Sequence, residues 1–198
     1  ILANGPGTVT YAVIGVPSDS GFANFTISLG TKTCNFSIRV NSGSIGAIDC
    51  NAGTVTGNAV AGALASGLSF KVPYSGGNGQ SHDGQTVSSS TVTGLTAVLS
   101  PSNFNNGVGD LIYNVTGTPS GAGNAVFNVN IGGKTCTFIM NVVSGSVDTL
   151  KCNSGSIMGS LTAGSVASGV SFTIPYTNGN GGSHSGQIIN STGVLGLT

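Results

Sequence analysis

The chain has 198 residues, of which only 5% are charged, against about a quarter in typical globular proteins. Its five basic and five acidic residues cancel, so it lacks the clustered Lys and Arg that nucleic acids and anionic membrane surfaces attract. No run of about 18 apolar residues is present to span a bilayer. A hydrophobic content of 38% without net charge also argues against a disordered chain.

The first and second halves of the chain are copies of one another with a period of 102 residues. Aligning residues 1–96 with residues 103–198 gives 45 identities. A period of this length is too long for one coil of a solenoid and is the size of one sandwich domain. We therefore expect an all-β chain made of tandem immunoglobulin-like β-sandwich modules.

In chain order, the repeat divides the sequence into three parts. Residues 1–44 are expected to be the C-terminal part of a preceding module, residues 45–143 one complete module, and residues 144–198 the N-terminal part of the following module. The short, uncharged Ser42-Gly43-Ser44 is the expected linker, and it is copied at residues 144–146. Because both ends fall inside a repeat, we expect the parent protein to continue on both sides.

Apolar and polar residues alternate along the complete module, as in half-buried strands. The pattern predicts strands at about 45–50, 54–57, 68–74, 85–92, 95–99, 109–116, 124–131 and 134–143. Gly132-Gly133 predicts a two-residue hairpin between the last two strands, and the small residues 59–66 leave room for a turn of helix. We expect matching phenylalanines to be buried in both copies: Phe25 and Phe127, Phe36 and Phe138, Phe70 and Phe172.

The four cysteines occupy two positions of the repeat. We expect disulfides, and hence an oxidising, extracytoplasmic setting, rather than buried free thiols. One pairing joins Cys50 to Cys136, which lie early in the first and last strands of one module and come together if those strands run side by side in parallel. The other is a hairpin at the linker, joining Cys34 to Cys50 and Cys136 to Cys152. We favour Cys50–Cys136, because folding back at the linker would stop the modules from stacking in a row.

The loop 73–85 and its copy 175–187 form the longest match between the repeats and offer the best candidates for a ligand site. Their side chains are of types that bind a sugar or a peptide: Tyr74, Asn78, His82 and Gln85, and in the second copy Tyr176, Asn180, His184 and Gln187. The alternative is a structural loop, in which glycines supply unusual dihedral angles and polar side chains satisfy backbone groups. We favour the structural loop, because it contains no Trp or Arg, two frequent binding hot spots.

The sequence offers no catalytic, cofactor or metal site. His82 is followed by Asp83, but its copy His184 is followed by Ser185, so a Ser-His-Asp triad is not repeated. The five acidic residues are all Asp, and no two lie at matched positions, which leaves neither a glycosidase pair nor a repeated calcium site. No Cys-x-x-Cys motif is present to bind zinc. We expect a protein that is not an enzyme.

Several motifs resemble the repeat modules of very large surface proteins of Bacteroidota. They are the segment 167–183 (ASGVSFTIPYTNGNGGS), Gly-Gln followed by Val-x-Gly-Leu-Thr, Gly-Thr-Pro-Ser at 117–120, and Asn-Ile-Gly-Gly-Lys-Thr-Cys at 130–136. Proteins of that kind are long arrays exported by type IX secretion, and they include adhesins of the gliding-motility class. The resemblance implies a Gram-negative cell surface and an adhesive or fibre-forming use, and it supplies no catalytic residues.

These features predict a structural spacer, or shaft, of a cell-surface fibre or adhesin that extends a distal adhesive tip. Two alternatives stay open: an adhesin module that binds glycan or peptide through the loop 73–85 and its copy 175–187, or a self-assembling extracellular filament subunit joined by strand addition. The expected partners are neighbouring copies of the module, other fibre subunits and glycans. No nucleic acid and no membrane insertion are expected.

Overall fold

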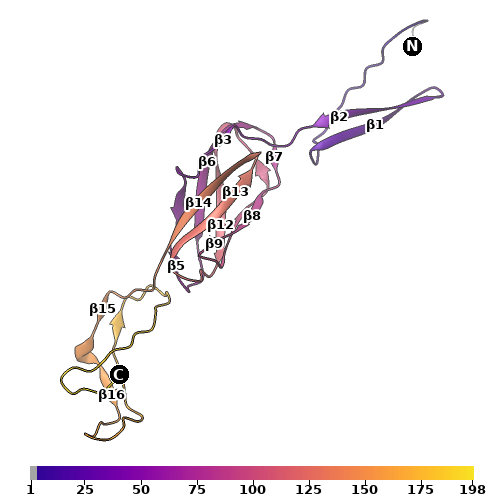
Figure 1. The fold of residues 1–198 in the computed structure, drawn as a ribbon. Coiled ribbons are helices and arrows are strands. Elements are labelled where there is room, and N and C mark those ends of the chain that lie inside the picture. Colours follow the sequence, from indigo (N-terminus) through magenta and orange to yellow (C-terminus); the bar gives the residue numbers. More distant parts are fainter. Residues whose placement is uncertain (1–3) are drawn as a thin grey trace.

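The structure, a computed structural model, describes residues 4–198 as an all-β chain. Figure 1 shows three β-rich segments in a row, with the N-terminus at one end and the C-terminus in the segment at the other. We name them the N-terminal segment (residues 4–44), the central segment (residues 45–143) and the C-terminal segment (residues 144–198).

The N-terminal segment contains one long antiparallel hairpin. Its strands are β1 (Gly21–Leu29) and β2 (Lys32–Val40). No second sheet covers this hairpin within the part of the chain that the structure describes.

The central segment contains two sheets packed face to face. In the first, the strand order is β3-β6-β12-β10-β8, with β4 also paired to β6; in the second it is β5-β14-β13-β9. The first sheet consists of β3 (Ala47–Ile48), β4 (Thr54–Thr56), β6 (Leu68–Asn78), β8 (Gln85–Ser88), β10 (Leu95–Leu99) and β12 (Asn106–Gly117). The second consists of β5 (Ala59–Val60), β9 (Ser90–Thr91), β13 (Gly123–Ile131) and β14 (Lys134–Val143). A short ladder of β7 (Ser81–His82) and β11 (Ser102–Asn103) lies beside them.

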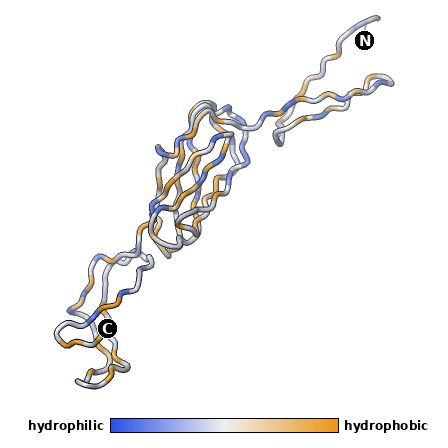
Figure 2. Tube along the Cα trace, in the orientation of Figure 1, coloured by the Kyte–Doolittle hydropathy of each residue, from blue (hydrophilic) through white to orange (hydrophobic). Residues whose placement is uncertain are grey.

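The core lies between these two sheets because alternate side chains of each strand point inward. Hydrophobic and hydrophilic residues accordingly alternate along the central strands (Figure 2). The ring of Phe70, from the first sheet, stacks on Phe138 of the second sheet at 4.2 Å and on its neighbour Tyr113 at 4.8 Å. Aromatic pairs of this kind contribute about 0.5–1.5 kcal/mol each beyond the burial of their area.

A disulfide between Cys50 and Cys136 joins the two sheets, with the Cα atoms 5.8 Å apart. The strand arrangement that we expected around this disulfide, with the first and last strands of the module side by side, is wrong. The first strand, β3, pairs with β6 of its own sheet, and the strand that runs parallel beside β14 is β5. The cysteines therefore meet across the core, because Cys50 follows β3 at the edge of one sheet and Cys136 lies in β14 of the other.

Two local expectations also need correction. The strand expected over 85–92 is divided at Ser89, where β8 ends in the first sheet and β9 begins in the second. At this change of sheet, the hydroxyl of buried Ser89 accepts a hydrogen bond from the Leu95 amide at 3.1 Å, so a backbone donor is satisfied there. The residues 59–66 form β5 and a turn rather than helix, since Ala59 and Val60 extend the second sheet.

The hairpin expected at Gly132-Gly133 is confirmed, and both residues have positive φ angles, 58° and 77°. Such angles suit a two-residue connection whose twist matches that of the flanking strands. The β1–β2 hairpin has the same register as β13–β14: Phe25 faces Phe36 as Phe127 faces Phe138.

The C-terminal segment holds two small two-stranded sheets, β15–β18 and β16–β17. Its elements are β15 (Thr149–Leu150), the 3-10 turn η1 (Cys152–Ser154), β16 (Ser156–Met158), β17 (Ser171–Thr173) and β18 (Tyr176–Thr177). Their registers repeat those of β3 and β4 on β6: Leu150 faces Tyr176 as Ile48 faces Tyr74.

The expected burial of matching phenylalanines is wrong for the two end segments. Phe70, Phe127 and Phe138 are at most 3% exposed, whereas their counterparts Phe172, Phe25 and Phe36 are 59%, 37% and 57% exposed. The difference arises because the central residues lie between two sheets, and the end segments present the same apolar faces without a second sheet over them.

Breaking the Cys50–Cys136 disulfide should destabilise the central segment. The bond joins residues separated by 86 positions, and the entropic model of cross-linking gives about 4–5 kcal/mol for a loop of this size as an upper estimate. Urea unfolding with and without a reductant measures the difference. Cys34→Ser, which removes a thiol outside the disulfide, is the control, and an unfolding free energy unchanged by reduction would contradict the prediction.

Candidate functional site

The loop 73–85 lies at the junction between the central and N-terminal segments. It begins in the last part of β6, includes β7 and ends where β8 starts at Gln85. The linker Ser42-Gly43-Ser44 runs directly beside it, because the Gly43 amide donates a hydrogen bond to the Ser81 carbonyl at 2.9 Å. The candidate ligand residues are therefore next to the linker that joins the two segments.

Asn78 holds this linker from both sides. Its Oδ1 accepts a hydrogen bond from the Ser44 amide at 3.1 Å, and its Nδ2 donates to the Ser42 carbonyl at 3.3 Å. The backbone amide of Asn78 also donates a hydrogen bond to the Ser44 carbonyl at 3.1 Å. Gly43 is buried, and a Cβ there would collide with the Ser81 carbonyl. The small linker residue is thus required by close backbone packing.

The second junction repeats this arrangement. The Oδ1 of Asn180 accepts from the Ser146 amide, and its Nδ2 donates to the Ser144 carbonyl, both at 2.9 Å. The Gly145 amide donates to the Ser183 carbonyl at 2.8 Å, as Gly43 does to Ser81. We call these two sets of hydrogen bonds the linker clamps. Through these bonds, Asn78 and Asn180 hold the backbone of each linker in place.

The other three candidates of the first copy also make contacts within the central segment. The Tyr74 hydroxyl accepts a hydrogen bond from the Asn105 amide at 2.6 Å. The His82 ring packs on Phe104, with centroids 4.6 Å apart, and its Nδ1 accepts from the Gly84 amide at 3.2 Å. Gln85 Oε1 accepts from the Tyr113 hydroxyl at 2.8 Å and from a backbone amide at 3.3 Å.

Burial fixes the protonation of two groups around this loop. Desolvation lowers the pKa of His82 below its usual 6.5, and the neighbouring Asp83 carboxylate opposes that effect more weakly. The ring is therefore neutral at pH 7 with Nδ1 as an acceptor, as its contact with Gly84 requires. Burial raises the pKa of Tyr113, so its hydroxyl keeps the proton that it donates to Gln85.

In the second copy, the same loop is more open. A cavity of about 490 Å³ is lined by Tyr176, Asn180 and His184 among others. In the first copy, Phe104 occupies the equivalent place, with its ring 5.3 Å from Tyr74 and 4.6 Å from His82. The cavity thus corresponds to a packing position that an aromatic side chain fills in the first copy. Gln187 lies exposed, away from this cavity.

The loop 175–187 also contacts the central segment. The Ser183 amide donates a hydrogen bond to the Ala61 carbonyl at 2.7 Å, and Gly62 packs against the Ser183 side chain. Sequence analysis missed this contact, although Ala61-Gly62 recurs at residues 163–164. It also missed Phe104 and Tyr113 as neighbours of the loop, because neither is close to it in the sequence.

The described residues bring no three His, Cys, Asp or Glu side chains together as a metal site. Within the same residues, Lys71 and Asp110 form an exposed ion pair at 3.2 Å. None of the described helices has the length and apolar character needed to cross a membrane.

No family model and no curated protein matches this sequence. Among solved structures, the chain has some similarity to the surface layer protein SbsC, domains 1–6, at 18% sequence identity and a TM-score of 0.33. The match covers 79% of this chain and 25% of that chain, so this chain spans about a quarter of that protein's structure. A likeness at this level carries no argument about function.

Replacing Asn78 by Ala should release the linker. The side chain makes hydrogen bonds to Ser42 and Ser44, and each such bond contributes about 1 kcal/mol net. We expect the Ser44 amide to exchange with solvent at least several-fold faster, as measured by hydrogen exchange. Asn51→Ala is the matched control, since no hydrogen bond of its side chain is found in the described structure. Equal exchange in the two variants would contradict the clamp.

The stability of the central segment should fall on acidification through His82. Because folding lowers the pKa of His82 from 6.5, the unfolded chain binds more protons than the folded chain as the pH falls below 6.5. The stability that the neutral His82 ring contributes to the folded state is therefore fully present above pH 6.5 and is lost as the pH falls through the lower pKa of the folded state. Unfolding of His82→Gln between pH 7.5 and 5 should show a smaller decrease than the parent chain, and the exposed His184→Gln serves as control.

Proposed function

We propose that this chain is a structural spacer of a cell-surface fibre, in which β-sandwich modules are held in a row by clamped linkers. The observation that carries this proposal is the recurrence of the linker clamp at both junctions, through Asn78 and Asn180. A linker whose carbonyl and amide groups are bound to the module that follows enters that module in a fixed direction. At the second junction, the hydrogen bond from the Ser183 amide to the Ala61 carbonyl also holds the preceding module. A row of such modules is long and has a defined direction, as a shaft requires.

The use of the loop residues supports a spacer over a binding module. All four candidates of the first copy, Tyr74, Asn78, His82 and Gln85, make hydrogen bonds within the chain. Residues committed to the backbone in this way are poor ligand contacts. The alternative, a glycan or peptide site, is favoured only by the cavity at Tyr176 and His184.

The remaining details of the proposal come from the sequence. We propose that the modules are immunoglobulin-like sandwiches with a period of 102 residues and belong to a large exported surface protein like those of Bacteroidota. The disulfide between Cys50 and Cys136 supports an oxidising, extracellular location. The chain is not an enzyme in this proposal, and its partners are neighbouring modules.

Deleting residues 43–144 tests the spacer role in the surface protein that carries this segment. The deletion removes one whole period and joins Ser42 to Gly145, which preserves the linker sequence. We expect a fibre shorter by one module in electron micrographs, with attachment of the cells unchanged.

A loss of attachment in a fibre that is still displayed would contradict the spacer role. The double variant His82→Ala, His184→Ala then separates the alternatives. A spacer tolerates it with a modest loss of stability, whereas a ligand loop loses binding on a glycan array while the fold survives.

A further inference from the structure

The asparagines of the two linker clamps are each followed by glycine. The sequence contains five Asn-Gly pairs, at residues 4–5, 78–79, 106–107, 178–179 and 180–181. The pairs 78–79 and 180–181 hold the clamp residues and lie at matching positions of the repeat. Both Asn78 and Asn180 are exposed. The side chains that hold the linkers therefore stand in the sequence context that most favours loss of a side-chain amide.

The chemistry of an Asn-Gly pair needs no reactant other than water. The Gly79 backbone nitrogen forms a bond with Cγ of Asn78 and gives up its proton, while the bond from Cγ to Nδ2 breaks and the amine takes up a proton and leaves as ammonia. Water then opens the cyclic imide to aspartate or isoaspartate. Gly79 and Gly181 have no Cβ to crowd this approach, and both have positive φ angles, 72° and 76°.

The hydrogen bonds of the clamp are placed to assist this attack. Oδ1 of Asn78 accepts from the backbone amides of Ser44 and Gln80, both at 3.1 Å. Oδ1 of Asn180 has the corresponding two amide donors, at 2.9 and 3.1 Å. Negative charge develops on this oxygen when the nitrogen adds to Cγ, and backbone N–H groups aimed at a developing oxyanion stabilise it. The clamp thus resembles an oxyanion hole around its own side chain.

We propose that Asn78 and Asn180 are sites of spontaneous deamidation, and that this modification releases the linker. Nδ2 of Asn78 donates a hydrogen bond to the Ser42 carbonyl at 3.3 Å. An aspartate has acceptors only, so its oxygen repels the carbonyl oxygen that the amide had bound. Isoaspartate also inserts a methylene into the main chain, which displaces the side chain. The junctions therefore loosen as the protein ages.

This proposal goes beyond the spacer role and rests on the clamps alone. A clamp that is lost by deamidation can be measured whether or not the parent protein is a spacer, and deletion of one module tests the spacer role independently.

The pair Asn106-Gly107 provides a comparison within the same chain. Asn106 is exposed and lies opposite Asn78 in the β6–β12 ladder. Gly107 also has a positive φ angle, 94°. No hydrogen bond of the Asn106 side chain is found in the described structure. The two pairs therefore share their sequence and their place in the sheet, and they differ in the donors on Oδ1.

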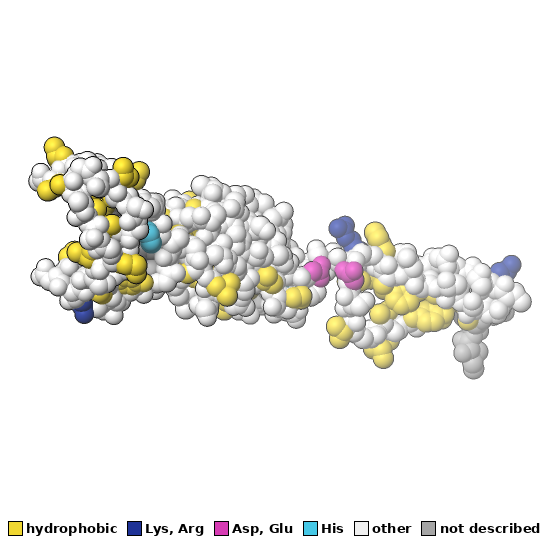
Figure 3. Space-filling view, turned by 90° about the horizontal axis from the view of Figure 1, so that it is seen from below, with side chains coloured by type: hydrophobic (Ala, Val, Ile, Leu, Met, Phe, Trp, Pro, Cys, Tyr) yellow, Lys and Arg dark blue, Asp and Glu magenta, His cyan; other side chains and the backbone are white. Residues whose placement is uncertain are grey.

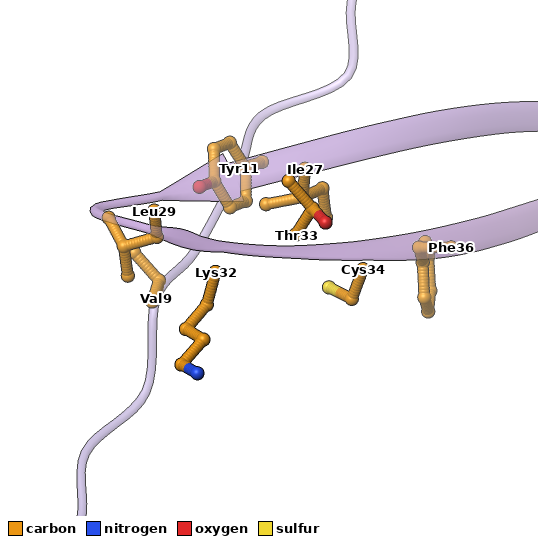
Figure 4. Close-up of a pocket in the computed structure, with 8 residues that line it drawn as sticks. All are labelled: Val9, Tyr11, Ile27, Leu29, Lys32, Thr33, Cys34 and Phe36. Atoms are coloured by element: carbon orange, nitrogen blue, oxygen red, sulfur yellow. The ribbon is translucent and has the colours of Figure 1, made fainter.

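Ageing the chain in a mildly alkaline buffer tests the modification. The exposed thiols of Cys34 and Cys152 are alkylated first, so that oxidation does not change the chain. Cys34 lines a groove of the N-terminal segment (Figure 4), and no residue of the linker is among those that line it. Peptide mass spectrometry should show Asn78 deamidating about fivefold faster than Asn106, the effect on the barrier of one hydrogen bond of ordinary net strength. A rate at Asn78 no higher than that at Asn106 would overturn the proposal.

The change of charge allows the modified chain to be isolated. Charged side chains are sparse on the visible face of the molecule (Figure 3), and the formal net charge is zero at pH 7. Each deamidation adds one negative charge. Ion exchange therefore separates aged chains from the parent.

Hydrogen exchange tests the release of the linker. The variant Asn78→Asp reproduces one product, and the Ser44 amide in it should exchange several-fold faster than in the parent, as it should in the isolated aged chain. Asn106→Asp is the matched control, because it adds the same charge at the same end of the sheet and should leave this exchange unchanged. An unchanged rate in Asn78→Asp, or an equal increase in both variants, would overturn the release.

Discussion

The packing of one sheet against the other around Phe70 is the contact on which the rest of the structure depends. A sheet with one apolar face is stable only when that face is covered. In the central segment, Phe70 lies between Phe138 and Tyr113, and β6 runs without a break from Leu68 to Asn78. The matching sequence in the C-terminal segment forms only β17 and β18, with three and two residues, which pair with the short strands β16 and β15. Because β6 pairs with β12 along most of its length, the matching sequences form long or short strands according to the strand that pairs with them.

The junctions depend on a second constraint, the need to satisfy backbone groups where the chain leaves one segment for the next. Asn78 and Asn180 each bind the carbonyl and the amide of a linker. An amide side chain suits this task because it carries a donor and an acceptor at one end. The clamp works without charge, in keeping with a chain whose polar side chains are mostly those of Ser, Thr and Asn. Its hydrogen bonds join neutral groups and therefore depend little on salt concentration.

The proposed spacer role rests on the repeat of one module along the chain. In the central segment, the core face around Phe70 is covered by the second sheet, and a disulfide joins the two sheets. The loop 73–85 fixes the linker through Asn78, while Phe104 fills the space between Tyr74 and His82.

The sequence by itself determined the all-β class, the main strands and the turn at Gly132-Gly133, because these follow from local alternation and turn chemistry. It favoured the pair Cys50–Cys136 over the hairpin pairing, but from a strand arrangement that the structure corrects. Only the tertiary structure decided the rest. The change of sheet at Ser89 and the pairing of β5 with β14 depend on contacts distant in sequence. The sequence marks Asn78 as a candidate ligand residue, but its hydrogen bonds to the linker follow only from the fold. The burial of Phe70 and the exposure of Phe172 could not be distinguished from the sequence, because both phenylalanines stand in the same alternating pattern and differ only in whether a second sheet lies over them.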